Sequence, residues 1–104
     1  MVRHRFHFVI ALGRFNEGAK WVSDMNAACR KAGCVEGKLW SVGFGKSNEC
    51  VLEYDYDDIA AMDRDVTKFQ STAETMAAFR RGVEFRAPEH WPWDELLIES
   101  PTLA

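Results

Sequence analysis

Apolar and polar residues alternate along this chain with two periods, and the order in which the periods change predicts the secondary structure. A period of two residues is typical of strands, and a period near 3.6 residues is typical of helices. Strand-like alternation covers residues 4–12, 38–44, 49–56 and 95–99. Helical spacing covers residues 22–32 and 59–83. The predicted order is therefore strand, helix, strand, strand, helix, strand.

This order is that of a ferredoxin-like α+β sandwich, βαββαβ, with one antiparallel sheet in the strand order 4-1-3-2. At 104 residues the chain is expected to form a single domain, residues 1–104. Helices cover only one face of such a sheet. The other face must therefore contact water, a ligand or a second subunit.

The alternation also predicts which side chains face the helices. In the first strand these are the large apolar residues, and in the third strand they are the cysteine, leucine and tyrosines: Phe6, Phe8, Ile10, Leu12, Cys50, Leu52, Tyr54 and Tyr56. In the first helix a narrow apolar stripe is expected to be buried against them: Val22, Met25, Cys29 and Ala32.

Helix ends are predicted from residue types that satisfy free backbone groups. Asn16 is expected to cap the first helix, and Gly33 suits the left-handed residue that ends it. The second helical stretch is expected to break near Gln70, because residues 71–74 have the Ser-x-x-Glu form of a capping box.

Composition excludes several classes of function. The net charge is −3 and basic residues are single or paired, whereas nucleic-acid binding needs clustered Lys and Arg. The three cysteines lack a C-x-x-C spacing, so we expect reduced thiols and no metal site. The apolar run 6–12 is too short for a membrane span or a signal sequence, and we expect a cytoplasmic protein.

The sheet face away from the helices carries the candidate chemistry. Strands one and three are neighbours in the predicted order, so Arg5 and His7 oppose Glu53 and Asp55. One interpretation is a solvated face of matched charges. The other is a lined cavity in which His7 and a carboxylate, Glu53 or Asp55, form a proton-transfer pair.

Tryptophans bear on the choice between these interpretations. If Trp40 points away from the helices, it forms an aromatic wall beside His7, and otherwise it belongs to the core. Trp91 and Trp93 lie in a proline-containing segment, residues 87–94. Their exposure to water is unfavourable, so we expect them to pack on the core, on a partner subunit or over a pocket.

Several segments together resemble the dimeric α/β-barrel superfamily, and most of all small NIPSNAP-like and antibiotic-biosynthesis-monooxygenase-like proteins. They are the strand ECVLEYDY at 49–56, the acidic start Asp57-Asp58, the broken second helix and the closing ELLIE at 95–99. The resemblance implies a homodimer in which two sheets enclose a lumen. A lumen histidine on the first strand of cyclase-like relatives corresponds to His7. Haem-degrading relatives carry a histidine on the second helix, where this chain has none.

The resemblance thus implies a cofactor-independent cyclase, isomerase or monooxygenase acting on a small hydrophobic or aromatic substrate in the lumen. The expected catalytic residues are His7, Glu53 and Asp55. The expected ligand contacts are Arg5, Val9, Trp40 and Trp93. Two alternatives remain: a non-catalytic module that binds a small ligand, and a structural dimer whose lumen is filled by its own side chains.

Overall fold

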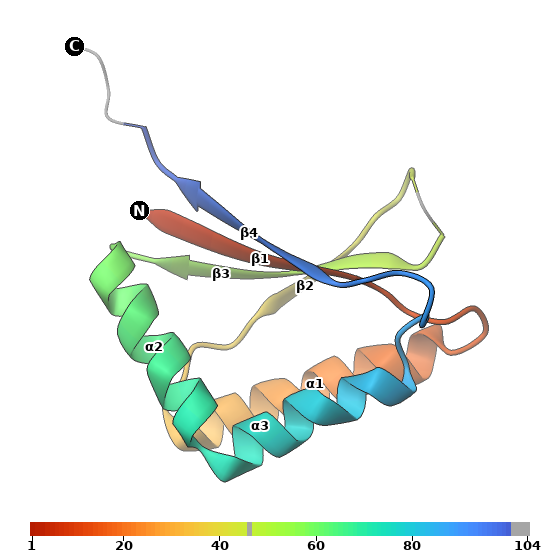
Figure 1. The fold of residues 1–104 in the computed structure, drawn as a ribbon, viewed down its shortest axis with the longest axis horizontal. Helices are drawn as coiled ribbons and strands as arrows, with labels where there is room; N and C mark the ends of the chain where they lie inside the picture. The colour runs from red at the N-terminus through yellow and green to blue at the C-terminus, as the bar shows by residue number, and fades with distance from the viewer. Residues whose placement is uncertain (46, 101–104) are drawn as a thin grey trace.

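Four strands form one antiparallel sheet, and the helices form a second layer on one of its faces (Figure 1). The structure is a computed structural model that describes residues 1–45 and 47–100. Its elements are β1 (Val2–Val9), α1 (Phe15–Ala32), β2 (Lys38–Ser41), β3 (Glu49–Tyr56), α2 (Ile59–Ser71), α3 (Ala73–Arg80), the 3₁₀ turn η1 (Arg81–Glu84) and β4 (Trp93–Ile98). The sheet order β2-β3-β1-β4 is the predicted one, and the fold is ferredoxin-like.

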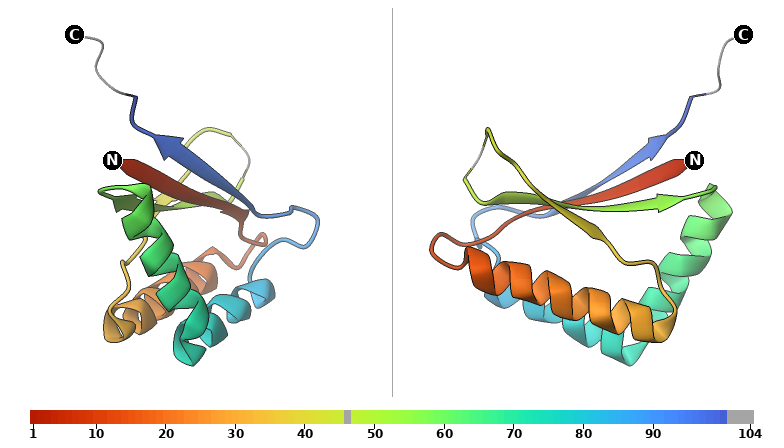
Figure 2. Two further views of the ribbon diagram at one scale, coloured as in Figure 1. Left: turned by 60° about the vertical axis from the view of Figure 1, so that its left-hand side comes forward. Right: turned by 180° about the vertical axis from the view of Figure 1, so that it is seen from behind.

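The helix layer is uneven. Helices α1 and α3 lie side by side under the sheet, whereas α2 rises from their far end toward the end of β3 (Figure 2). No residue of α2 is fully buried, while α1 buries Trp21, Val22 and Met25. The sheet is therefore packed tightly by α1 and more loosely by α2.

The core lies between β1, β3 and α1, largely as the alternation predicts. Phe6, Phe8 and Ile10 are buried together with Leu52. Leu12 was expected in this set, but the prediction is wrong because β1 ends at Val9 and Leu12 is 79% exposed in the turn that follows.

Helix ends follow the predictions only in part. Gly33 ends α1 with φ 78°, as predicted. Asn16 is not the N-cap, because α1 begins at Phe15 and Arg14 holds the capping position. The predicted break is confirmed at Thr72, between α2 and α3. The Ser71 capping box is wrong, since the Ser71 hydroxyl donates to the Thr67 carbonyl at 2.5 Å instead.

The strand bounds of the second half also differ from the prediction. Strand β2 covers only Lys38–Ser41, three residues short of the predicted end at residue 44. Strand β4 begins at Trp93, two residues before the predicted start at residue 95. This earlier start places Trp93 and Asp94 in the sheet beside β1.

Pairing in the sheet settles the orientation of β2. Leu39 pairs with Leu52, so Leu39 faces the helices and packs against the core. Trp40 pairs with Val51 and faces away from the helices. We call this side, which carries the Lys38, Arg3, Arg5 and His7 side chains, the open face of the sheet.

Candidate functional site

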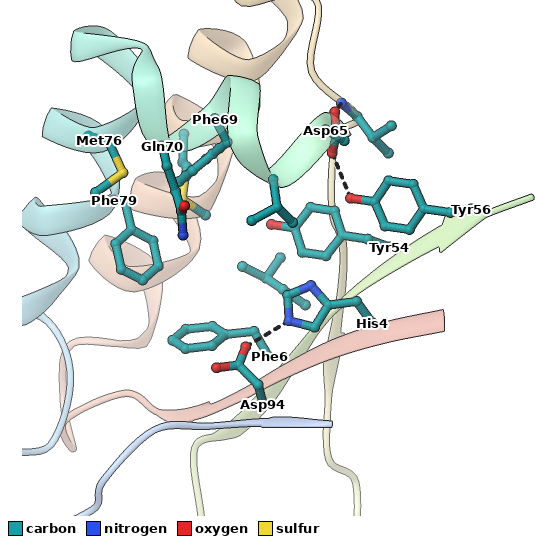
Figure 3. A pocket seen from close by; sticks show the side chains of 14 residues that line it. His4, Phe6, Tyr54, Tyr56, Asp65, Phe69, Gln70, Met76, Phe79 and Asp94 are labelled. Atoms are coloured by element: carbon teal, nitrogen blue, oxygen red, sulfur yellow. Dashed lines mark hydrogen bonds and ion pairs between the residues drawn. The ribbon is translucent and has the colours of Figure 1, made fainter. Parts of the chain in front are cut away.

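A cavity of about 220 Å³ lies between the sheet and helices α2 and α3, where the helix layer is loose (Figure 3). Most of its lining is apolar: Phe6, Met25, Val35, Leu52, Val66, Phe69, Met76 and Phe79. Its polar lining residues are His4, Tyr54, Tyr56, Asp65, Gln70 and Asp94. An apolar pocket with a few convergent polar groups is the usual form of a small-molecule site.

His4 and Asp94 form a hydrogen-bonded pair in the cavity wall. His4 Nε2 lies 2.7 Å from Asp94 Oδ1, and the imidazole stacks on Tyr54 with ring centroids 5.7 Å apart. An ionised carboxylate only accepts hydrogen bonds, so Nε2 carries the proton and Nδ1 carries the lone pair of the neutral ring. A histidine oriented by a carboxylate in this way is equipped to accept and return a proton.

Tyr56 and Asp65 form a second polar pair in the lining. The Tyr56 hydroxyl donates to Asp65 Oδ2 at 2.6 Å, and the Val35 amide donates to Asp65 Oδ1 at 3.0 Å. Burial, followed by this hydrogen bond, raises the pKa of the Tyr56 phenol far above its ordinary value. Burial likewise raises the pKa of Tyr54, and both phenols therefore stay protonated at neutral pH.

His7 lies on the open face and also contacts a carboxylate of β4. His7 Nε2 is 3.2 Å from Glu95 Oε1, and its ring lies flat on Trp93 with centroids 3.7 Å apart. Glu95 also accepts from Arg5 at 3.4 Å. The hydrogen bond from His7, with a smaller contribution from Arg5, lowers the pKa of Glu95.

The two carboxylates predicted to assist His7 contact arginines instead. Glu53 accepts from Arg5 Nε at 3.1 Å, and Asp55 accepts from Arg3 Nε at 2.7 Å. The hydrogen bond from Arg3 lowers the pKa of Asp55. The structure therefore brings His7 together with Glu95, which the sequence reasoning missed. Catalytic roles for Glu53 and Asp55 stay predictions.

The predicted ligand contacts all lie on the open face, in different surroundings. Val9 is buried, whereas Trp40 and Trp93 are 47% and 54% exposed. The Lys38 ammonium lies 4.6 Å from the ring centroid of Trp40. Trp40, Val51, His7 and Trp93 form one row across the four strands. The next row alternates in charge: Lys38, Glu53, Arg5 and Glu95.

His4 was missed as a site residue, although a signal for it exists. His4 and His7 lie three residues apart in a strand and so face opposite sides of the sheet. His4 therefore shares its face with Phe6, where a polar ring is unusual. A polar side chain among core residues is more informative about a functional site than another apolar one.

The three cysteines of the chain lie in its interior. Cys29, Cys34 and Cys50 are free and buried, and burial raises the pKa of Cys29 and Cys50 to about 11. Over residues 1–45 and 47–100, no group of three His, Cys, Asp or Glu residues is placed to hold a metal ion. Within the same residues, no helix has the length and apolar character needed to cross a membrane.

Comparison with known proteins identifies the fold. No family model matches the sequence, and no curated protein matches it significantly. An uncharacterised NIPSNAP-domain protein from Burkholderia xenovorans superposes with a TM-score of 0.75 at 19% identity, covering 96% of this chain and 95% of that one. A putative antibiotic biosynthesis monooxygenase from Nitrosomonas europaea gives 0.70 at 10% identity, covering 95% and 98%.

A NIPSNAP-family protein from Agrobacterium tumefaciens is similar in the same way. Its TM-score is 0.73 at 12% identity, and the match covers 95% of this chain and 85% of that one. At identities this low, the similarity shows a shared fold but says nothing about the reaction or the ligand. The chain therefore has the ferredoxin-like fold of NIPSNAP-domain and antibiotic-biosynthesis-monooxygenase-like proteins.

Proposed function

We propose that this protein is an enzyme that binds a small hydrophobic or aromatic substrate in the cavity beside α2 and transfers a proton through His4. The hydrogen bond between His4 and Asp94 at the cavity wall is the observation that carries the proposal. The reaction is of the cyclase, isomerase or monooxygenase kind, in which removal of a proton activates the substrate.

Asp94 and His4 have different roles in the proposed proton transfer. Asp94 fixes the tautomer of His4, so that Nδ1 is the basic nitrogen, and it stabilises the imidazolium formed when His4 takes a proton. The apolar walls formed by residues such as Phe6 and Phe79 contact the substrate body, while the Asp94 side chain, 66% exposed, lies at the solvent edge of the cavity. A positioned general base of this kind contributes about 10²- to 10⁴-fold in rate.

The cavity limits the size of the substrate. An apolar cavity of about 150 Å³ holds benzene, and sites for drug-sized ligands begin near about 300 Å³. The volume here, about 220 Å³, falls between these sizes. The substrate body is therefore one or two rings, or an aliphatic group of similar bulk.

We also propose that a second copy of the chain covers the open face. Trp40 and Trp93 are about half exposed on this face, at the two ends of the row that crosses the sheet. Exposed tryptophans favour association, and a symmetric dimer covers the same surface on both copies. The homodimer implied by the family resemblance has this arrangement. The buried, free cysteines are consistent with the reducing cytoplasm.

A second candidate site is the lumen that such a dimer encloses. His7, in contact with Glu95 and stacked on Trp93, faces that space. There the proton-transfer pair is His7–Glu95, with Arg5, Val9 and Trp40 as ligand contacts.

Native mass spectrometry of freshly purified protein tests both proposals together, because it reports the subunit count and any retained molecule. The cavity-filling variant Val66→Trp is the key comparison, and His7→Gln is the matched change on the open face. We expect a dimer whose bound mass is lost in Val66→Trp and kept in His7→Gln. Bound mass that is kept in Val66→Trp and lost in His7→Gln indicates that the site is the lumen. A bound molecule that is never converted indicates a binding module.

A parent protein without retained ligand is tested with a probe. 1-Naphthol has two rings and a fluorescence that reports its burial. Saturable uptake that Val66→Trp abolishes supports the cavity. No uptake by the parent protein contradicts it and favours the structural alternative.

A further inference from the structure

The cavity contains an unbalanced set of charges. Its lining includes the carboxylates of Asp65 and Asp94, and no Lys or Arg is among its lining residues within the described chain. The open face of the same sheet is different, because basic side chains lie among its carboxylates: Arg3, Arg5 and Lys38 beside Glu49, Glu53, Asp55 and Glu95. Lys68 lines a neighbouring pocket together with Asp65, but its ammonium donates to the Gly33 carbonyl. A ligand that enters the cavity therefore meets two carboxylates, with His4 as the one basic side chain in the described lining.

Asp65 and Asp94 are hydrogen-bonded, but not to a lysine or an arginine of the described residues. Asp65 is held by a phenol and a backbone amide, and Asp94 by an imidazole. None of these three partners is a lysine or an arginine. Asp65 and Asp94 also contribute to the raised pKa of Tyr54, after burial, which is the effect expected of negative charge near a group that would become an anion.

The walls of the cavity are aromatic as well as apolar. Phe6 and Phe79 lie with ring centroids 5.6 Å apart at a 55° tilt, and Phe69 meets Phe79 edge to face at 6.0 Å. Tyr54 and Tyr56 line the same space (Figure 3). Rings tilted against one another present both faces and edges to a ligand. The negative face of an aromatic ring attracts organic cations.

We infer that the ligands of the cavity are small organic amines bound as cations, an inference that rests on the binding site proposed above. The apolar body occupies the phenylalanine end of the cavity, and the ammonium group lies toward Asp94. Two interactions favour a cation here. The negative faces of the aromatic rings attract it, and so do the carboxylates, which have no lysine or arginine beside them in the described lining. The same walls disfavour carboxylate and phosphate ligands, for which basic side chains are the usual partners.

Three probes with the same ring test this inference at neutral pH: benzylamine as the cation, benzyl alcohol as the neutral molecule and benzoate as the anion. Affinities are measured by isothermal titration calorimetry, with amide chemical shifts locating each probe. We expect benzylamine to bind about tenfold more tightly than benzoate, with benzyl alcohol between them. Asp94→Asn is expected to reduce the ratio of benzylamine to benzoate affinity several-fold.

Asp55→Asn removes an aspartate from the open face and serves as the matched control, with an unchanged ratio expected. Benzoate binding in the cavity as tightly as benzylamine overturns the charge inference and leaves the proposed site standing. Absence of binding by all three probes, or binding that Val66→Trp leaves intact, overturns the proposed site itself.

Discussion

The two faces of the sheet present the same pair of residue types in different settings. Strand β1 turns His4 toward the helices and His7 away from them, and successive residues of β4, Asp94 and Glu95, contact one histidine each. His4 lines a cavity within its own chain. His7 is covered by Trp93 and adjoins a network of ion pairs. The two histidine–carboxylate pairs are chemically alike, so it is the neighbouring cavity that makes His4–Asp94 the better candidate for binding a small molecule.

Charge separates the two faces further. On the open face Arg3 and Arg5 each contact carboxylates of β3, so the charges there are paired within one chain. The cavity has carboxylates but no Lys or Arg among its described lining, and is suited to a ligand. The helix side is therefore the candidate site for chemistry, and the open face the candidate surface for association.

Loss of His4 is the substitution with the largest expected effect. With a substrate identified by the mass spectrometry above, His4→Gln is expected to lower kcat about 10²- to 10⁴-fold because the base is lost. His7→Gln, the same change on the other face, is expected to leave kcat within a few-fold of the parent value. Steady-state kinetics on both variants decides between the faces. A large loss in His7→Gln alone places the reaction in the lumen.

Stability is expected to depend more on the helix side. Leu52 is 1% exposed in the core, and Leu52→Ala is expected to lower the free energy of unfolding by about 2–5 kcal/mol. Val51, its neighbour on β3, faces the open side, and Val51→Ala is expected to have less than half that effect. Urea denaturation at two protein concentrations measures both. Equal losses in dilute protein contradict the difference between the faces.

Association is expected to depend on the open face. Trp40→Asp places an unpaired carboxylate where a second copy is proposed to pack, and loss of a tryptophan that is buried in an interface typically costs at least about 2 kcal/mol of binding. Sedimentation equilibrium is expected to show at least about a thirtyfold weaker dimer. Phe44→Asp, at a fully exposed residue of the turn after β2, is the control. A strictly monomeric parent protein contradicts the proposed dimer.

Much of this architecture follows from sequence periods, because alternation in β1 and β3 specifies which residues are buried. The site does not follow from them. The contacts of Asp94 and Glu95 depend on where β4 begins, and Pro92 obscures that boundary in the sequence. The cavity depends on how α2 leans against the sheet. Side chains of α2 such as Val66 and Phe69 have the expected spacing but are only partly buried, and no local pattern encodes that looseness.

The smallest expected effect is a pH dependence on the open face. His7 and Arg5 lower the pKa of Glu95 below its ordinary value of 4.5. The folded state therefore favours the ionised form, and the resulting stability is present above the ordinary pKa and is lost as the pH falls through the folded pKa. Glu95→Gln is expected to be slightly less stable than the parent protein near neutral pH, with the difference shrinking in acid.

Thermal unfolding followed across this acidic range measures the difference between the parent protein and Glu95→Gln. Asp63→Asn, at an exposed position of α2, is the control for removal of one negative charge. A difference that stays constant as the pH falls contradicts a role for ionised Glu95 in the fold. A difference that grows with dimer concentration shows that the same ion pair also supports association, because Glu95 then contributes to stability through the surface that the second copy covers.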